Sequence, residues 1–359
     1  MQHQTDDLRI VETKEVIAPS ELHQELPVSE KSAQCVFTAR SVTQKILHGE
    51  DDRLLVVVGP CSIHDTDAAR EYSERLAKVR DEVADDLMII MRVYFEKPRT
   101  TVGWKGLIND PDLDDSFKIN QGLRVARKLL LDLNESGMPA GTEYLDLISP
   151  QYVADLVSWG AIGARTTESQ VHRELSSGLS CPVGFKNATD GGLQVAVDAI
   201  GSAMNPHHFL SVTKEGKSAI FSTAGNKDCH IILRGGSDKP NFSAESINEA
   251  SALLEKSGLA ARIMVDLSHA NSLKQHEKQV EVGDSIAAQL SAGDMRIFGL
   301  MIESHLVAGR QNAKPGQDLV YGQSITDACL GWEDTETLLH TLANAVRERR
   351  HSKSTASAA

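Results

Sequence analysis

The sequence predicts an α/β protein built on a (β/α)8 TIM barrel, with an N-terminal extension and an inserted β-hairpin. Short runs rich in Val, Ile and Leu alternate with helix-like stretches along most of the chain. Eight such runs occur, and each precedes a helical pattern. Eight strand–helix units are typical of a barrel of about 250 residues. The alternative, a doubly wound open sheet, more usually has about six strands.

Each strand is expected where an apolar run lies between turn-forming residues, and each helix where apolar residues recur at helical spacing, as at Leu123, Ala126 and Leu130. The expected strands are 54–61, 87–95, 139–145, 161–166, 182–187, 229–234, 262–269 and 297–304. The expected helices are 68–83, 117–134, 150–159, 168–176, 193–203, 244–256, 279–290 and 335–347.

Three segments fall outside this repeat. Residues 1–50 precede the first strand and contain a helical pattern at 27–48, which we interpret as a regulatory or oligomerisation arm. Within the barrel domain, 51–350, the connection after the fifth strand is too long for one helix. Its part at about 207–223 predicts a hairpin with Gly216 at the turn. The Ser/Ala-rich tail 351–359 is expected to be disordered.

Composition excludes several classes of partner. The 359 residues carry 37 basic and 50 acidic side chains, a net charge of −13, which disfavours nucleic acid and anionic membrane surfaces. No apolar run reaches the roughly 18–20 residues of a membrane span, and the acidic start does not resemble a signal peptide. Five cysteines without such a signal indicate a cytoplasmic protein with free thiols. Four of them are expected to be structural: Cys35, Cys181, Cys229 and Cys329.

Barrel enzymes place their sites at the carboxyl ends of the strands. In this sequence every predicted strand ends near a thiol, an ionisable group or an imidazole, whereas polar residues at single strand ends are usually solvated loop starters. These residues are Cys61, Arg92, Glu143, Arg165, Lys186, Arg234, His269 and Glu303.

One subset suits a divalent transition metal. It contains a thiol, an imidazole and two carboxylates: Cys61, His269, Glu303 and Asp327. Taken singly, each has an ordinary alternative as a small buried thiol, a core histidine or a helix-start carboxylate. His64, close to Cys61, is a less favoured ligand. Mixed sulfur, nitrogen and oxygen ligands accept Mn²⁺, Fe²⁺, Co²⁺ or Zn²⁺, so the metal stays open.

The other subset is cationic, and it predicts a site for anions. Like charges that converge on one barrel mouth repel unless an anion neutralises them, and arginine binds phosphate and carboxylate bidentately. Their number suggests two phosphorylated substrates, while the alternative is a set of solvated surface cations. The residues are Arg92, Lys97, Arg99, Arg165, Lys186 and Arg234. Gly163 and the Gly235–Gly236 pair would let backbone N–H groups approach a phosphate.

Five segments resemble the type I DAHP synthase family, over about residues 6–350, and most of all its bacterial phenylalanine-sensitive branch. They read GPCSIH from Gly59, MRVYFEKPRTTVGWKG from Met91, GARTTESQ from Gly163, DLSHAN from Asp266 and SITDAC from Ser324. The resemblance implies condensation of phosphoenolpyruvate with erythrose 4-phosphate and water, which gives a seven-carbon keto-sugar phosphate and phosphate, the first step of the shikimate pathway. It also implies a homotetramer made of two dimers.

The resemblance implies roles for individual residues. The metal would be held by Cys61, His269, Glu303 and Asp327. Phosphoenolpyruvate would contact Arg92, Gly163, Ala164, Arg165, Lys186 and Arg234, with Glu143 nearby. Erythrose 4-phosphate would contact Lys97, Pro98, Arg99 and Thr100. The catalytic set would be Lys97, as proton donor, with Cys61, His269 and Glu143.

Feedback inhibition by phenylalanine is also implied, because the family's phenylalanine-sensitive forms carry Ser where Ser211 stands and its tyrosine-sensitive forms carry Gly. Ser211 could otherwise be an ordinary polar strand residue. The inhibitor site would contain Asp146, Pro150, Gln151, Leu179, Ser180, Phe209, Ser211 and Phe221, with Asp6 and Asp7 from a neighbouring subunit. Two other functions are considered: a 3-deoxy-octulosonate 8-phosphate synthase, disfavoured by the Lys97–Thr100 run, and a catalytically silent amino-acid sensor.

One position departs from the family pattern. Ala188 stands where the family usually has Gly, in the run KNATDG from Lys186. If the backbone there had a positive φ, Ala188 would cost about 1 kcal/mol.

Overall fold

The barrel strands are the centre of the fold. The computed structural model describes residues 3, 5–101, 103–313 and 318–357. Within these ranges, eight parallel strands close into a ring, as the sequence predicts, and β1 pairs with both β2 and β10. The strands are β1 Leu54–Gly59, β2 Leu87–Arg92, β3 Ala140–Glu143, β4 Trp159–Ile162, β5 Val183–Lys186, β8 Cys229–Leu233, β9 Ile263–Asp266 and β10 Ile297–Glu303.

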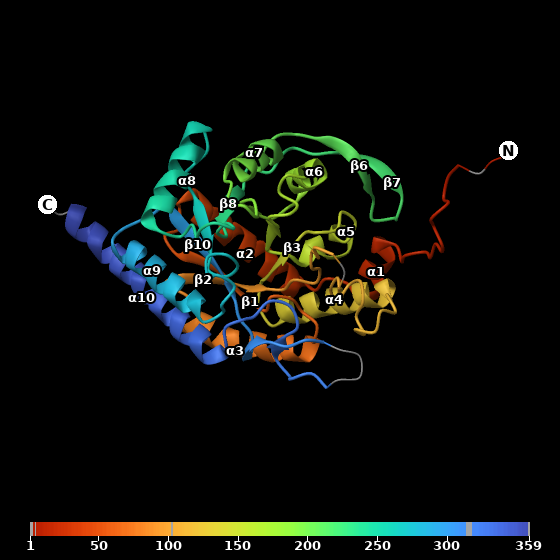
Figure 1. The fold of residues 1–359 in the computed structure, drawn as a ribbon, viewed down its shortest axis with the longest axis horizontal. Helices are drawn as coiled ribbons and strands as arrows, with labels where there is room; N and C mark the ends of the chain where they lie inside the picture. The colour runs from red at the N-terminus through yellow and green to blue at the C-terminus, as the bar shows by residue number, and fades with distance from the viewer. Residues whose placement is uncertain (1–2, 4, 102, 314–317, 358–359) are drawn as a thin grey trace.

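Helices surround this ring (Figure 1). They are α3 Thr66–Glu82, α4 Ile119–Glu135, α5 Pro150–Val153, α6 Gln170–Gly178, α7 Gln194–Ala203, α8 Ala244–Lys256, α9 Lys278–Ser291 and α10 Trp332–Ser357. Among the described residues, no helix combines the length and the apolar character needed to cross a membrane.

Two expectations about helices are wrong. The predicted helix 150–159 ends early: α5 is followed by a short 3-10 turn, Ala154–Leu156, and Trp159 begins β4. Trp159 is fully buried and its indole N–H lies 3.3 Å from His230 Nε2, so barrel packing overrides local helical spacing. The tail expected to be disordered is helical as far as Ser357, because α10 continues through its Ser/Ala sequence. Residues 358–359 lie outside the described residues.

The barrel interior is closed at its amino-terminal end by the N-terminal segment. Alternate residues of β1 face opposite sides: Leu55 and Val57 point into the ring, where they pack in one cluster with Ile46 and Leu47 of α2, Glu30–His48. The side chain of Ser29 caps the start of α2, and the helix ends at Gly49 with a φ of 80°. A short helix that the sequence reading missed, α1 Pro19–Glu25, precedes it.

The expected hairpin is present as β6 His208–Val212 and β7 Ser218–Ser222. The strands are antiparallel, with Phe209 opposite Phe221, and Gly216 has a φ of 74° in the turn. The hairpin lies beside α6 and α5, because Ser177 and Thr223 share a hydrogen bond of 2.6 Å and Lys214 Nζ donates to the Gln151 carbonyl. A small parallel sheet, β11 Val307–Arg310 with β12 Gln323–Ser324, follows β10.

Candidate active site

The charged residues predicted at the strand ends gather around one cleft. Its cavity volume is about 180 Å³. The lining residues are Lys97, Pro98, Arg99, Thr100, Glu143, Gly163, Ala164, Arg165, Lys186, Thr189, Arg234, His269 and Asp327. Thr189 was not anticipated, because nothing in the sequence pattern separates it from an ordinary loop residue. Arg92, Cys61 and Glu303 are buried beside this cleft and are connected to its lining residues by the contacts described below.

Three of the four predicted metal ligands form a tight cluster. One oxygen each of Glu303 and Asp327 and the Sγ of Cys61 all lie within 4.8 Å of one another. The fourth ligand, His269, stands beside them, with Nε2 3.9 Å from Glu303 Oε1. Register explains the meeting of distant residues, since Gly59, two residues before Cys61, pairs with Glu303 across the β1–β10 seam. A thiolate, an imidazole and two carboxylates form a donor set that fits a divalent transition metal.

Lys97 links this cluster to the cleft. Its Nζ lies 3.0 Å from Cys61 Sγ and 3.3 Å from the Cys61 carbonyl oxygen. Burial and the negative charge of Glu303 raise the pKa of Cys61 to about 11, although Lys97 acts in the opposite direction. Burial disfavours a charged Lys97, but Cys61 and Glu303 outweigh it and raise the pKa of this ammonium group. The amine is therefore a protonated donor at neutral pH.

Arg92 is the most deeply buried cation of the site. Its guanidinium donates to Glu303 Oε1 at 3.0 Å and to the Pro60 carbonyl at 3.1 Å, and it lies 3.5 Å above the Tyr94 ring. A guanidinium held by a carboxylate, a carbonyl and an aromatic face has one fixed orientation. Arg92 therefore supports Glu303 from within the barrel as well as adding positive charge below the cleft.

Asp266 is a functional residue that the sequence reading missed. It closes β9 and is fully buried, and its Oδ2 lies 2.9 Å both from Lys186 Nζ and from His269 Nδ1. Burial alone would raise the pKa of Asp266, but Lys186 and His269 hold it well below its usual range. The signal was an acidic residue inside a predicted apolar strand, which a buried position tolerates only with charged partners.

The wall formed by β3 and β4 has little spare room. A Cβ on Gly163 would lie 2.3 Å from Glu143 Oε1, and this oxygen is buried without a hydrogen-bond partner among the described residues. Next to it, Arg165 donates to the Pro98 carbonyl at 2.9 Å and so joins the β4 loop to the Lys97–Thr100 run. The backbone at Gly163 and the Glu143 carboxylate therefore face each other across a gap that a larger residue could enter only if the Glu143 side chain moved.

The end of β8, one strand beyond β5, carries Arg234. Its backbone N–H donates to Asn187 Oδ1 at 2.8 Å, which fixes the start of this loop. Burial lowers the pKa of Arg234, and the charge of Arg165 adds to this effect, whereas Asp266 opposes it. Two cations that repel each other in one cleft are stabilised by an anion bound between them.

The departure at Ala188 carries no backbone strain. Ala188 does not lie in the left-handed region, whereas Gly191, three residues on, has a φ of 105°. Hydrogen bonds of 3.0 Å join Ala188 N to Gly192 O and Gly191 N to Ala188 O, so the turn depends on Gly191. Because the φ of Ala188 is not positive, alanine at this position does not carry the free-energy cost that a left-handed backbone would impose.

The residues predicted for an inhibitor site lie in the turn before α5 and on α5, directly after α6, on the hairpin, and on the N-terminal arm; the contacts above bring α5, α6 and the hairpin together. Asp146 accepts hydrogen bonds from the backbone N–H groups of Ile148 and Ser149, at 2.6 and 2.8 Å, and so shapes the turn before Pro150. The rings of Phe209 and Phe221 lie 6.1 Å apart. Asp6 and Asp7 lie on the N-terminal arm, which extends away from the body of the chain (Figure 1).

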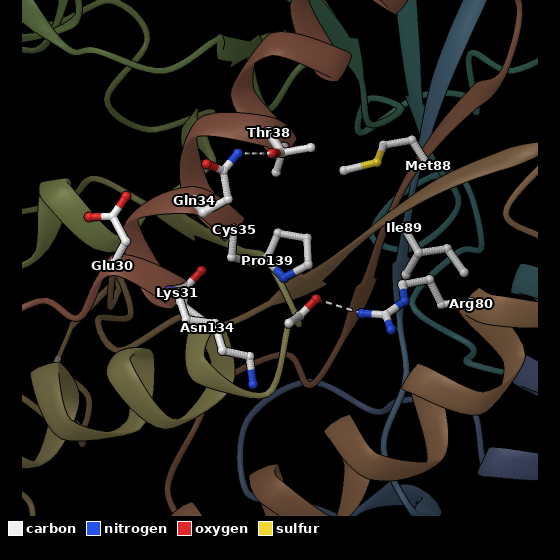
Figure 2. Close-up of a pocket in the computed structure, with 12 residues that line it drawn as sticks. Glu30, Lys31, Gln34, Cys35, Thr38, Arg80, Met88, Ile89, Asn134 and Pro139 are labelled. Carbon is white, nitrogen blue, oxygen red and sulfur yellow. Dashed lines mark hydrogen bonds between the residues drawn. The ribbon is translucent and has the colours of Figure 1, made fainter.

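A larger hollow lies at the other end of the barrel. It has a cavity volume of about 720 Å³ between α2, α3 and the loop before β3, and its lining includes Cys35, Met88 and Pro139. Figure 2 shows that polar side chains here contact local partners: Gln34 donates to Thr38 at 2.9 Å, and Arg80 donates to the Gly137 carbonyl at 2.6 Å. The convergent charged groups belong to the cleft at the carboxyl ends of the strands, which is therefore the candidate active site.

A closed (β/α)8 barrel with a metal-type ligand cluster beside an anion-binding cleft defines the class: a barrel enzyme for phosphorylated substrates. The sequence model of the DAHP synthetase I family matches residues 25–340. The chain belongs to this family.

Individual relatives agree with this assignment. The Phe-sensitive phospho-2-dehydro-3-deoxyheptonate aldolase of Escherichia coli K12 is 62% identical over 350 residues, 98% of this chain and 100% of that protein. The Trp-sensitive enzyme of Salmonella typhimurium is 54% identical over 347 residues, 97% of this chain and 99% of that protein. A solved structure of the aldolase from Francisella tularensis SCHU S4 matches with a TM-score of 0.92 and 55% identity, covering 95% of this chain and 99% of that one.

Proposed function

We propose that this protein condenses phosphoenolpyruvate with erythrose 4-phosphate and water, giving 3-deoxy-D-arabino-heptulosonate 7-phosphate and phosphate. The observation that carries the proposal is the cleft itself, where five predicted cations and the Gly163 backbone line a small cavity, with the sixth cation, Arg92, buried beside it and the cluster of Cys61, Glu303 and Asp327 at its border. Two phosphorylated substrates repel each other, and fixed cations remove that repulsion while holding the reacting carbons together.

In this proposal, phosphoenolpyruvate lies against the cationic groups nearest the barrel axis, with its phosphate toward the backbone of Gly163 and Ala164. These groups are Arg92, Arg165, Lys186 and Arg234. Erythrose 4-phosphate lies against the run Lys97, Pro98, Arg99 and Thr100, at the outer side of the cleft. The Arg165–Pro98 hydrogen bond keeps the two subsites in contact.

The residues of the cleft then promote formation of a carbon–carbon bond between the two substrates. The terminal methylene carbon of phosphoenolpyruvate attacks the aldehyde carbon, and Lys97 gives a proton to the aldehyde oxygen, which becomes a hydroxyl. Water adds to the carbon that carries the phosphate and returns one proton to the site. The bond between this carbon and the bridging oxygen then breaks, and the second proton of the water leaves with inorganic phosphate as the ketone forms. The free oxygen of Glu143 is available to orient that water.

The ligand set proposed for a divalent metal is Cys61, His269, Glu303 and Asp327. Cys61 and Glu303 are buried and Asp327 is exposed, and one donor atom of each lies within 4.8 Å of the others. Lys97 contacts Cys61 and Arg92 contacts Glu303, and a thiol with two carboxylates offers a donor set that suits such an ion. When bound there, the ion would polarise the aldehyde oxygen as a Lewis acid.

A phosphate-release assay tests the reaction. We expect phosphate release with both substrates together, its loss after chelation, and its return with Mn²⁺, Fe²⁺, Co²⁺ or Zn²⁺, which also ranks the metals. Activity that survives complete metal removal, or that needs no erythrose 4-phosphate, would overturn the proposed function.

We further propose that phenylalanine inhibits the enzyme at the residues around the hairpin: Asp146, Pro150, Gln151, Leu179, Ser180, Phe209, Ser211 and Phe221, with Asp6 and Asp7 of a neighbouring subunit. The half-buried Ser211 on β6 would exclude the extra hydroxyl of tyrosine. Ser211→Gly should therefore gain sensitivity to tyrosine while its uninhibited rate stays unchanged. Inhibition of the unmodified enzyme by tyrosine but not by phenylalanine would contradict the proposal.

A homotetramer in the cytoplasm completes the proposal. The arm exposes Leu8, Ile10 and Val11, and the outer face of the hairpin exposes Leu210 and Ile220, which a second subunit would cover. The five free cysteines suit a reducing compartment. Mass photometry should find a tetramer, and a variant without residues 1–12 should shift toward smaller species.

A further inference from the structure

We propose that Asp266 is a shared positioning residue, whose single carboxylate holds both the metal ligand His269 and the phosphoenolpyruvate-binding Lys186. The inference rests on the proposed function, because that function assigns the two groups to different ligands. Geometry carries it: one oxygen, Asp266 Oδ2, lies 2.9 Å from Lys186 Nζ and 2.9 Å from His269 Nδ1.

The carboxylate itself is fixed. Its other oxygen, Oδ1, accepts hydrogen bonds from Ser268 N at 3.0 Å and from Ser268 Oγ at 2.6 Å. The Asp266 carbonyl accepts a further hydrogen bond, at 2.8 Å, from Asn271 Nδ2. With a fully buried side chain and four donors on its two oxygens, Asp266 has no second orientation available.

The His269 side of this contact determines which ring nitrogen faces the ligand cluster. His269 has a φ of 58°, a left-handed conformation that non-glycine residues rarely adopt. This backbone turns the ring so that Nδ1 faces Asp266 and Nε2 faces Glu303. Nδ1 also lies 2.7 Å from Ser268 Oγ, which is itself hydrogen-bonded to Asp266 Oδ1. When this carboxylate and hydroxyl hold Nδ1, the Nε2 lone pair is left toward Glu303, 3.9 Å away.

The Lys186 side of the contact aims a buried ammonium group. Lys186 ends β5 and its side chain is 5% exposed, while it also lines the cleft. Asp266 balances its charge and anchors Nζ, leaving the remaining N–H donors for an anion in the cleft. Loss of this anchor leaves an uncompensated buried charge in a mobile side chain, which weakens its hold on an anion.

The test is Asp266→Asn, which keeps shape and removes the charge. Binding of Mn²⁺ to the metal-free protein, and of phosphoenolpyruvate to the metal-free protein, is measured by calorimetry, so that neither readout needs turnover. We expect both dissociation constants to rise by about 10- to 100-fold, the usual effect of losing a partner that orients a ligand. A rise in one constant alone, or in neither, would overturn the shared role.

Two further variants keep the test decisive. Asp86→Asn is the matched control, because Asp86 is also a buried carboxylate bonded to two cations, Arg347 and Arg350, at the distant end of β2. It should lose stability as Asp266→Asn does, yet bind both ligands normally. If Asp266→Asn does not fold, Ser268→Ala removes a donor to Oδ1 together with the hydroxyl 2.7 Å from His269 Nδ1, so its effect on phosphoenolpyruvate binding, through Lys186, is the readout. That dissociation constant should rise by a smaller factor, about 3- to 10-fold; unchanged phosphoenolpyruvate binding would overturn the inference.

The unmodified protein separates the two levels of the argument. If it binds neither Mn²⁺ nor phosphoenolpyruvate, the proposed function fails. If it binds both and the Asp266 variant matches it, the proposed function stands and the shared role of Asp266 fails.

Discussion

The contact between Gly163 and Glu143 gives the sharpest prediction about the cleft. In Gly163→Ala the added methyl would stand 2.3 Å from Glu143 Oε1 and 3.2 Å from Cδ, whereas ordinary contact begins at 3.4 Å. One of the two groups must therefore retreat by about 1 Å. Gly163 has no positive φ, so the change introduces a steric conflict and no backbone strain. Glu143 is the group that moves, because it is a side chain with a free oxygen.

Overpacking costs up to about 1–3 kcal/mol in folding, and the same free energy lost from phosphoenolpyruvate binding would correspond to a roughly 5- to 150-fold rise in its dissociation constant. We expect that rise in the KM and dissociation constant of phosphoenolpyruvate, since the displaced Glu143 and the Gly163 backbone both border its subsite, with much less change in the KM of erythrose 4-phosphate. Steady-state kinetics and calorimetry measure the two effects.

A matched control and a double variant test the cause. Gly201→Ala adds the same methyl on α7 where nothing lies within 4 Å, so it should leave KM unchanged and stabilise the helix slightly. If Glu143 is the obstacle, Gly163→Ala should have little further effect in a Glu143→Ala background. Equal effects in both backgrounds, or a normal KM in the single variant, would refute the reasoning.

The other predictions concern pH, a loop and the metal. Burial, the charge of Asp146 and that of Glu143 raise the pKa of Glu96 to about 7 from 4.5, against a 2.9 Å hydrogen bond from Ser149. The folded state thus binds this proton more tightly than the unfolded state, so the free energy of unfolding falls as pH rises from 4.5 to about 7. In urea unfolding measured at pH 5 and at pH 8, Glu96→Gln should reduce the difference between the two free energies of unfolding by about 1–3 kcal/mol. The same difference in the variant and the unmodified protein would contradict the prediction. Ala188→Gly should lower the free energy of unfolding by about 0.5–1 kcal/mol, since it adds only unfolded-state freedom, and a stabilised variant in thermal unfolding would show that the loop needs glycine. Cys61→Ser should weaken Mn²⁺ binding about 100-fold or more while thermal stability changes little, and normal affinity would remove Cys61 from the ligand set.

Local sequence predicts most of the barrel because each strand is a continuous buried run between turn residues, and the closed ring leaves each helix one apolar face to bury. The ends of the strands were less predictable. The apolar run predicted as the first strand ends at Cys61, whereas the last residue of β1 that pairs with a neighbouring strand is Gly59. Cys61 is buried beside the cleft without belonging to the strand, so burial alone extends the apolar run. Trp159 could not be placed from its neighbours, because its partner His230 lies 71 residues away.

The site could be predicted as a set of strand ends, because parallel strands bring their carboxyl ends to one mouth. The role of Asp266 as a support could not be predicted in this way. Asp266 ends β9, but its contact with Lys186 joins β9 to β5, and no local motif of the sequence indicates that contact. The small space between Gly163 and Glu143 likewise depends on two neighbouring strands and on no local motif.

The seam between β1 and β10 has a consequence for how the chain acquires its structure. Residue 59 pairs with residue 303, so the ring cannot close during synthesis until more than four-fifths of the 359 residues have been made. Contacts this distant in sequence fold slowly. Cys61 and Glu303 flank the same seam, so the ligand cluster forms only when the ring does, and uptake of Mn²⁺ by a refolding chain would report the closing step itself.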